Sequence, residues 1–148
     1  MTSHIICAAP RFARVKEAQT VFDILTSCRF EIPLPESFCM QQVSNGCKLK
    51  QYWVVESDQA IAGVMRLIAN DIFFLAVSPE YRKRGIARSL IAYAKKRWQS
   101  LTAKTRNENA PTIALLESEG FERDYSALVL NSEWISYAWV RPGRHKFA

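Results

Sequence analysis

The sequence predicts a mixed α/β fold in one domain that spans residues 1–148. Three apolar stretches follow one another at Tyr52–Glu56, Ala60–Ile68 and Asp71–Val77, with short connections between them, which is typical of an antiparallel meander. Segments in which apolar residues recur at helical spacing lie on either side of these strands. A chain of 148 residues is long enough for one hydrophobic core and too short for two comfortable ones.

The N-terminal third has the weakest pattern. A short strand is expected near Ile5–Ala9, and a helix over about Phe12–Cys28. Residues 28–40 contain two prolines and show little periodicity, with a short helix expected around Glu36–Val43.

The second half of the chain predicts alternating helices and strands. After Gly85, apolar residues recur at helical spacing to about Trp98, and a further helix is expected over Asn109–Glu119. Leu101–Thr105 can form a strand between these helices. One or two strands are expected within residues 121–140.

The turn before the first of these helices is basic and carries a glycine, with the sequence Arg-Lys-Arg-Gly-Ile-Ala over residues 82–87. The preceding run Ile72–Val77 has no polar alternation, so we expect a strand that is covered on both faces. Backbone N–H groups at a helix start converge on an anion, and Gly85 lets a phosphate approach without a Cβ in the way. The turn is predicted to bind a phosphorylated ligand, although an ordinary strand-to-helix connection is the simpler alternative.

The charge distribution favours a local anionic ligand. The chain has 20 Lys and Arg residues against 14 Asp and Glu residues, a net charge of +6. Residues 80–97 hold seven basic residues and one acidic residue, so this segment alone carries +6 and the rest of the chain sums to zero. An excess confined to one turn and helix suggests one anionic target rather than general polyanion binding.

Neither a metal site nor a disulfide framework is expected. The four cysteines are widely spaced without a C-x-x-C pair, and the two histidines, His4 and His145, lie near the ends of the chain. We expect the cysteines to be reduced and packed as small hydrophobic residues. The apolar run Ile5–Pro10 is too short for a signal peptide or a membrane span, so the cytoplasm is the expected location.

Two blocks of sequence resemble the GNAT superfamily of acyl-CoA-dependent N-acyltransferases. Residues 76–87 are similar to the family's pyrophosphate block, a hydrophobic strand followed by V-x-P-x-Y and R/Q-x-x-G-x-G/A. Residues 109–121 are similar to its N-x-x-A-x-x-L-Y-E-x-x-G-F helix. The resemblance implies a central, mostly antiparallel mixed sheet of six to seven strands flanked by helices. It also implies a splayed pair of parallel strands at the acyl-CoA site.

The resemblance further implies transfer of an acetyl group from acetyl-CoA to a primary amine through a ternary complex, with no metal. Backbone groups of the basic turn would hold the pyrophosphate, and the pantetheine arm would pair with the end of the preceding strand. The implied acyl-CoA residues are Leu75, Ala76, Val77, Arg82, Lys83, Arg84, Gly85, Ile86, Ala87, Arg88 and Asn109. Asn109 also suits the N-cap of the helix that follows it.

The catalytic residues are less well marked. Leu116 stands where many relatives have a tyrosine thought to protonate the departing thiolate, so that role is not carried over. Asp71 is the candidate general base, because comparison with the histone-acetyltransferase branch puts it where those enzymes have a glutamate; a bridging water is then expected. The alternative is that Asp71 only caps a tight turn. For Tyr81 and Tyr125, packing is a simpler account than proton donation.

The acceptor is expected to be a small-molecule or peptide amine, chosen by residues 28–40 and by Trp134, Tyr137 and Trp139, although a buried strand face is the simpler explanation for these three aromatic residues. No nucleic-acid or membrane partner is expected, and a homodimer is left open. A non-catalytic acyl-CoA sensor or scaffold of the same fold is the first alternative, which Leu116 motivates. A nucleic-acid-binding domain with salt-sensitive binding is the second, motivated by the basic segment.

Overall fold

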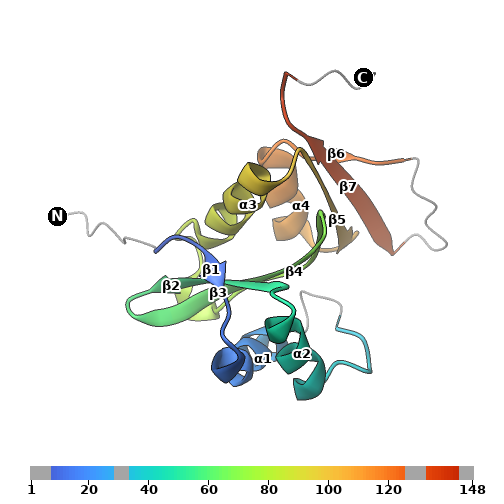
Figure 1. Cartoon of the computed structure of the whole chain (residues 1–148). Coiled ribbons are helices and arrows are strands. Elements are labelled where there is room, and N and C mark those ends of the chain that lie inside the picture. The colour runs from blue at the N-terminus through green and yellow to red at the C-terminus, as the bar shows by residue number, and fades with distance from the viewer. Residues whose placement is uncertain (1–7, 29–33, 126–132, 144–148) are drawn as a thin grey trace.

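The computed structural model describes residues 8–28, 34–125 and 133–143, with a seven-stranded sheet at its centre in the order β1-β2-β3-β4-β5-β7-β6. The strands are β1 (Arg11–Phe12), β2 (Tyr52–Ser57), β3 (Ala60–Ile68), β4 (Asp71–Val77), β5 (Ser100–Arg106), β6 (Glu122–Arg123) and β7 (Trp134–Val140). The helices are α1 (Ala18–Ser27), α2 (Met40–Lys48), α3 (Ile86–Arg97) and α4 (Ala110–Ser118), with 3₁₀ turns η1 (Val15–Glu17) and η2 (Pro79–Tyr81). Figure 1 shows α3 and α4 on one face of the sheet and α1 and α2 on the other. The mixed α/β prediction is confirmed.

The first helix begins later than the sequence predicts. Phe12, expected to open it, lies in β1 opposite Trp53 of β2, and the two ring centroids are 3.8 Å apart. The apolar side chain of Phe12 thus packs on the sheet, and α1 starts only at Ala18. Of the strand expected at Ile5–Ala9, residues 5–7 lie outside the described residues. Residues 8 and 9 are not assigned to a strand, although the backbone N–H of Ala8 donates to Glu56 O over 3.1 Å.

The short second helix is also displaced toward the C-terminus. It was expected around Glu36–Val43, and α2 occupies Met40–Lys48. Residues 36 and 37 instead form a turn, in which the N–H of Phe38 donates to the carbonyl of Pro35 over 2.9 Å. This turn uses backbone groups that a helix starting near Glu36 would need for its first turn.

The antiparallel meander of β2, β3 and β4 is confirmed, and β3 and β4 have the predicted bounds. Gly63 in β3 lies against α3, because a Cβ at this position would be 2.5 Å from Cγ2 of Ile86, the first residue of α3. A glycine therefore lets the start of α3 pack closely on the sheet.

β4 and β5 are parallel and pair only at their first residues. Asp71 is opposite Thr102 and Ile72 is opposite Ala103, and beyond these two positions the described strands diverge. β5 pairs with β7 along its whole length. β4 carries a bulge, since Arg66 of β3 is opposite Phe74 while the next residue of β3, Leu67, is opposite Ile72. The splayed parallel pair that the resemblance implied is present.

The expectation that β4 is covered on both faces is wrong at three of its positions. Ile72, Phe74 and Ala76 are buried, but Leu75 and Val77 are only half-buried and Phe73 is 46% exposed. The divergence from β5 accounts for Leu75 and Val77, whose side chains face the space left between the strands. An uninterrupted apolar run can therefore mark a strand that lines a ligand cavity rather than a strand buried in a core.

Candidate functional site

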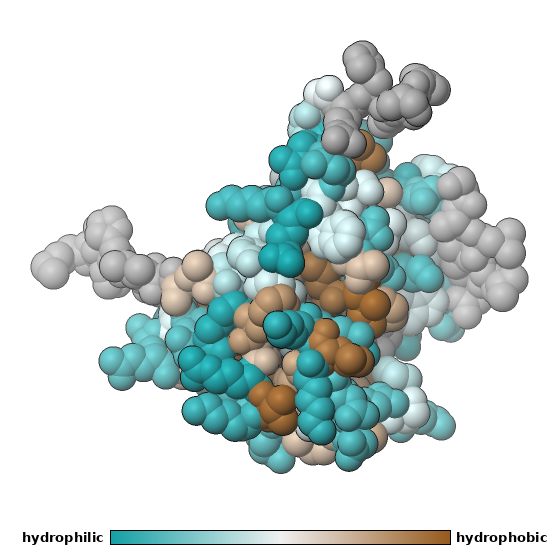
Figure 2. Space-filling model, in the orientation of Figure 1, coloured by the Kyte–Doolittle hydropathy of each residue, from teal (hydrophilic) through white to brown (hydrophobic). Residues whose placement is uncertain are grey.

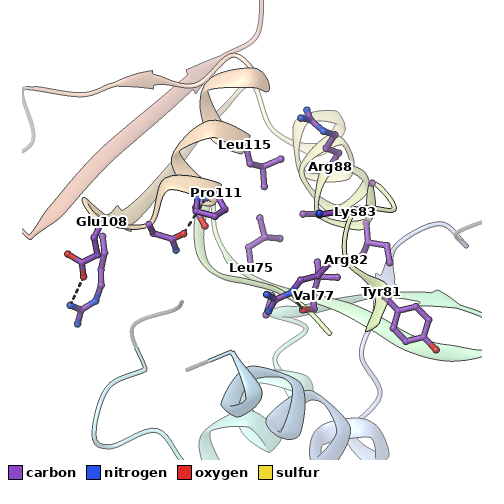
Figure 3. Close-up of a pocket in the computed structure, with 16 residues that line it drawn as sticks. Leu75, Val77, Tyr81, Arg82, Lys83, Arg88, Glu108, Pro111 and Leu115 are labelled. Carbon is purple, nitrogen blue, oxygen red and sulfur yellow. Dashed lines mark hydrogen bonds and ion pairs between the residues drawn. The ribbon is translucent and has the colours of Figure 1, made fainter. Parts of the chain in front are cut away.

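The divergence of β4 and β5 opens a cavity of about 490 Å³, shown in Figure 3. Its walls come from the end of β4, from the turn that leads into α3, and from the start of α4. Every residue of the predicted acyl-CoA set lines this cavity except Arg84. The sequence thus identified segments that are far apart along the chain and that the fold brings together.

Two helix N-termini open onto the cavity. Gly85 is the N-cap of α3 and has φ of 77°, in the left-handed region that glycine adopts without strain. A Cβ at Gly85 would meet no atom within 4 Å, so the space next to this backbone is free of other protein groups. Asn109 is the N-cap of α4, where its Oδ1 accepts a hydrogen bond of 3.3 Å from the N–H of Thr112. Helix starts carry partial positive charge, so both favour an anion in the cavity.

The charged side chains around the cavity are mostly basic. Arg82, Lys83, Arg88 and Arg106 line it. Among the described lining residues the one acid is Glu108, whose Oε1 lies 3.4 Å from Nη1 of Arg106. The cavity therefore suits a ligand with several negative charges.

Two of the predicted basic side chains, those of Arg84 and Arg88, form ion pairs with acidic residues in the described part of the chain. Nη1 of Arg84 lies 3.2 Å from a carboxylate oxygen of Asp58 in the turn between β2 and β3, so this side chain is directed away from the cavity. Nη1 of Arg88 lies 2.8 Å from Oε2 of Glu119, just beyond the end of α4, while Arg88 still lines the cavity. At Arg84, only the backbone is left to contact a ligand in the cavity.

A cysteine from the opposite helical layer reaches the end of β4. The thiol of Cys28, at the C-terminal end of α1, lies 3.6 Å from the carbonyl of Val77 and 3.6 Å from Nη2 of Arg82. Nε of Arg82 donates to the same carbonyl over 3.3 Å. These contacts fix the place where β4 leaves the sheet, and no local sequence pattern predicts them. Cys28 and Cys47 are buried as expected, whereas Cys39 is exposed.

Asp71 lies at the closed end of the gap and does not line the cavity. Its Oδ1 accepts a hydrogen bond of 2.7 Å from Oγ1 of Thr102, across the paired start of β4 and β5. As a whole residue, Asp71 is half-buried. It thus lies where the two strands part, four residues before Leu75.

Other side chains considered for proton transfer or substrate choice differ in how deeply they are buried. Leu116 is 2% exposed and packs in the core beneath α3 and α4, and Tyr125 is 82% exposed. Tyr137 and Trp139 are buried on the α4 side of β7. Burial raises the pKa of Tyr137, and its hydrogen bond to Glu117 raises it further. Of the tyrosines considered, only Tyr81 lines the cavity.

Sequence reasoning missed several residues that line the cavity. They are Arg106, Glu108, Pro111, Thr112 and Leu115. The sequence feature that could have identified them is their position in or just after the connection between β5 and α4, next to the predicted Asn109. Within the described ranges, no group of three or more His, Cys, Asp or Glu residues could hold a metal ion. Among the same residues, no helix has both the length and the apolar character that crossing a membrane requires.

A sequence profile of the acetyltransferase (GNAT) domain matches residues 48–123, about half of the chain, whereas no curated protein sequence matches. Several solved structures share the fold. A GNAT-family acetyltransferase from Bacillus cereus is 18% identical with a TM-score of 0.71, over 92% of this chain and 98% of that one. PaiA N-acetyltransferase from Thermoplasma acidophilum, solved with coenzyme A, is 13% identical with a TM-score of 0.72, over 92% and 99%.

The ribosomal-protein-S18-alanine N-acetyltransferase from Escherichia coli is 19% identical with a TM-score of 0.70, over 97% of this chain and 99% of that one. At such identities the structural likeness establishes a common fold and leaves the substrate open. The profile match covers the strands, the basic turn and the helices that form the cavity. This chain belongs to the GNAT acetyltransferase family.

Proposed function

We propose that the protein is an N-acetyltransferase that moves an acetyl group from acetyl-CoA to a primary amine within a ternary complex. The observation that carries the proposal is the cavity between β4 and β5, which combines an unpaired strand edge with two helix N-termini and basic side chains. A long ligand with an amide-bearing arm and a polyphosphate end fits these features.

Each part of the cavity suits one part of acetyl-CoA. The backbone N–H groups at the start of α3 would bind the pyrophosphate, with Arg82 and Lys83 adding charge. The backbone of Leu75–Val77 has no strand partner on the β5 side and would pair with the pantetheine amides. Asn109 would contact the same arm. The free space beside Gly85 supports this assignment, because a phosphate can lie directly against the backbone there.

The chain's own residues would then assist transfer in two ways. A lysine-like amine with a pKa of about 10.4 is mostly protonated at neutral pH, so a base has to accept its proton. Asp71 is the candidate, acting through a water. A strand N–H near Leu75–Val77 would stabilise the negative charge that forms on the thioester oxygen when the amine attacks. Leu116 cannot donate a proton, so the departing thiolate would take its proton from solvent.

Two measurements in sequence test the proposal. Calorimetry should detect saturable binding of acetyl-CoA, and a thiol-release assay over a panel of primary amines should then detect turnover. Binding without thiol release for any amine would contradict the enzyme and favour the acyl-CoA sensor, which the buried Leu116 motivates. Absence of acetyl-CoA binding, with salt-sensitive binding to nucleic acid instead, would contradict both.

A further inference from the structure

Arg66 of β3 is held in a fixed position on the face of the sheet that packs against α1 and α2. Its guanidinium carbon lies 5.5 Å from the ring centroid of Tyr52 and 5.8 Å from those of Phe73 and Phe74. Its Nε and Nη2 donate to Oε1 of Gln51 over 3.3 and 3.0 Å. Three rings and one amide oxygen thus orient the guanidinium before any ligand arrives.

This guanidinium has donors left over. Arginine has five N–H groups, and Gln51 accepts from two of its nitrogens. Across residues 8–28, 34–125 and 133–143, no carboxylate forms an ion pair with Arg66, whereas Arg84 and Arg88 have carboxylates at 3.2 and 2.8 Å. Arg66 is also half-buried, and a partly buried charge is normally paired. The remaining donors are therefore suited to an anion from outside the protein.

Phe73 links Arg66 to the point where β4 and β5 part. Ile72 is the last residue of β4 that pairs with β5, and Phe73 follows it in the bulge. Phe73 is 46% exposed, so the surface beside Arg66 is accessible there. If the acyl arm fills the cavity beside α3 and α4, the other face of the sheet is the side left for an amine to approach. Arg66 and Phe73 lie on that face.

The described residues on this face beside Asp71 include basic and apolar side chains. Figure 1 shows β5 and β7 extending beyond α1 and α2, and Figure 2, which views the sheet from the same side, shows hydrophobic groups at the centre of the molecule between hydrophilic ones. Lys104 of β5 is exposed, and Asp71 is the one acid in β4 and β5. A simple amine is a cation at neutral pH and would be repelled by Arg66 and Lys104. A negative group on the same molecule would turn this repulsion into attraction.

We infer that the acceptor is a primary amine that also carries a carboxylate, and that Arg66 binds this carboxylate. The planar guanidinium fork matches a carboxylate, and the amine of the same molecule is then directed toward Asp71 and the end of the acyl arm. The inference rests on the proposed function, because it places the acceptor opposite the acyl-CoA cavity. It names the class of substrate for that site.

The test compares ω-amino acids, from glycine to 6-aminohexanoate, with their carboxamides in the thiol-release assay. The two members of a pair have the same length and the same attacking amine, and differ chiefly in the negative charge. We expect at least one acid to have a kcat/KM about 10- to 100-fold above that of its amide, the size expected for a charge-assisted hydrogen-bonded pair. The chain length with the largest ratio reports how far the reacting amine lies from Arg66.

Substitutions at Arg66 test whether the preference for the acid depends on this residue. Arg66→Gln should raise the KM for the acid toward that of the amide, and Arg66→Lys should retain part of the preference. Arg97→Gln is the matched control, because Arg97 lies 5.0 Å from the ring of Trp53 and 5.8 Å from that of Tyr93, on α3 and thus on the other face of the sheet. This control should leave the preference unchanged.

The outcomes that contradict the inference are distinct from those that contradict the function. Equal rates for acids and amides in the wild-type protein would overturn the role of the carboxylate and leave an acetyltransferase in place, and this comparison does not depend on the folding of any variant. A preference that survives in Arg66→Gln would overturn the role of Arg66. Binding of acetyl-CoA without transfer to any amine would overturn the proposed function, and the inference with it.

Discussion

Thr102 donates a hydrogen bond of 2.7 Å to the carboxylate of Asp71, and this contact closes the end of the gap between β4 and β5. The two residues are opposite each other in the short parallel pair, after which the strands diverge. Asp71 is therefore in a position to influence both the geometry of the gap and the chemistry at its closed end. The two roles predict different results for neighbouring substitutions.

Asp71→Asn separates the two roles when it is compared with Thr102→Val. If Asp71 accepts the amine proton, Asp71→Asn should lower kcat by about 100-fold at pH 7, and the deficit should shrink as the pH approaches the amine pKa of about 10. Thr102→Val removes the hydrogen bond but keeps the carboxylate, so its effect should be much smaller. Equal, pH-independent losses in both variants would show that Asp71 acts only on strand geometry.

Gly85 has a matched control in Gly143. Both have positive φ, 77° and 87°, and at both a Cβ would meet no atom within 4 Å. Leucine at either position should cost a similar amount of stability, about 1–2 kcal/mol, because the left-handed conformation is unfavourable for it. Only Gly85→Leu should also raise the KM for acetyl-CoA, by about 10-fold or more, because its side chain would occupy the space assigned to the pyrophosphate. Matching KM values in the two variants would reject that assignment.

Gly63→Ala should disturb the proposed acetyl-CoA site by displacing the start of α3. Its Cβ would be 2.5 Å from Ile86, so the first turn of α3 has to move, and we expect a loss of about 1–3 kcal/mol in unfolding free energy together with a higher KM for acetyl-CoA. Gly46→Ala is the control, because its Cβ would be 2.4 Å from the ring of Tyr52 on the α2 side of the sheet. It should lower stability without raising the KM. Denaturant unfolding and steady-state kinetics on both variants check the expectation, and a KM effect of the same size in Gly46→Ala would contradict it.

The ion pair between Glu17 and Arg11 should make the stability of the fold depend on pH. Both carboxylate oxygens of Glu17 accept hydrogen bonds from Arg11, at 2.8 and 2.7 Å, and this lowers the pKa of Glu17 to about 2 against the opposing effect of burial. A lowered pKa in the folded state stabilises the protein above the unfolded-state pKa of about 4.3, and this contribution is lost as the pH falls toward 2.

Glu17→Gln should therefore be less stable than the wild-type protein at pH 7, by about 1–2 kcal/mol, with the difference closing below about pH 4. Urea unfolding at a series of pH values measures this. Glu56→Gln, which removes the more exposed partner of the same arginine, should have the smaller effect. A difference between Glu17→Gln and the wild-type protein that does not change with pH would contradict the ion-pair explanation.

The parts of the fold that the sequence predicted well are those fixed by local chemistry. Short connections set the bounds of β3 and β4, and Pro79 follows the end of β4. The start of α1 could not be predicted in the same way. The apolar side chain of Phe12 suits a helix face as well as a sheet, and only its contact with Trp53, far along the chain, decides between them.

In the candidate site, too, features set by local sequence could be predicted and features set by tertiary packing could not. Gly85 and the helix start could be recognised locally, because the backbone conformation of a turn is a local property. The partner of Arg84 could not, since Asp58 meets it only through the packing of a distant hairpin turn. Arg66 carries no sequence signal either, because its three aromatic neighbours come from β2 and β4. Side-chain direction in the site is thus a product of tertiary structure.

Titration of isotope-labelled protein with coenzyme A, followed by amide NMR, tests directly whether the cavity between β4 and β5 binds this ligand. We expect saturable shifts that cluster at Leu75–Val77, at residues 82–88 and at the start of α4, with an affinity that weakens with added salt. No saturation at millimolar coenzyme A would contradict the assignment of the cavity between β4 and β5. Saturable shifts confined to another part of the molecule would contradict it equally.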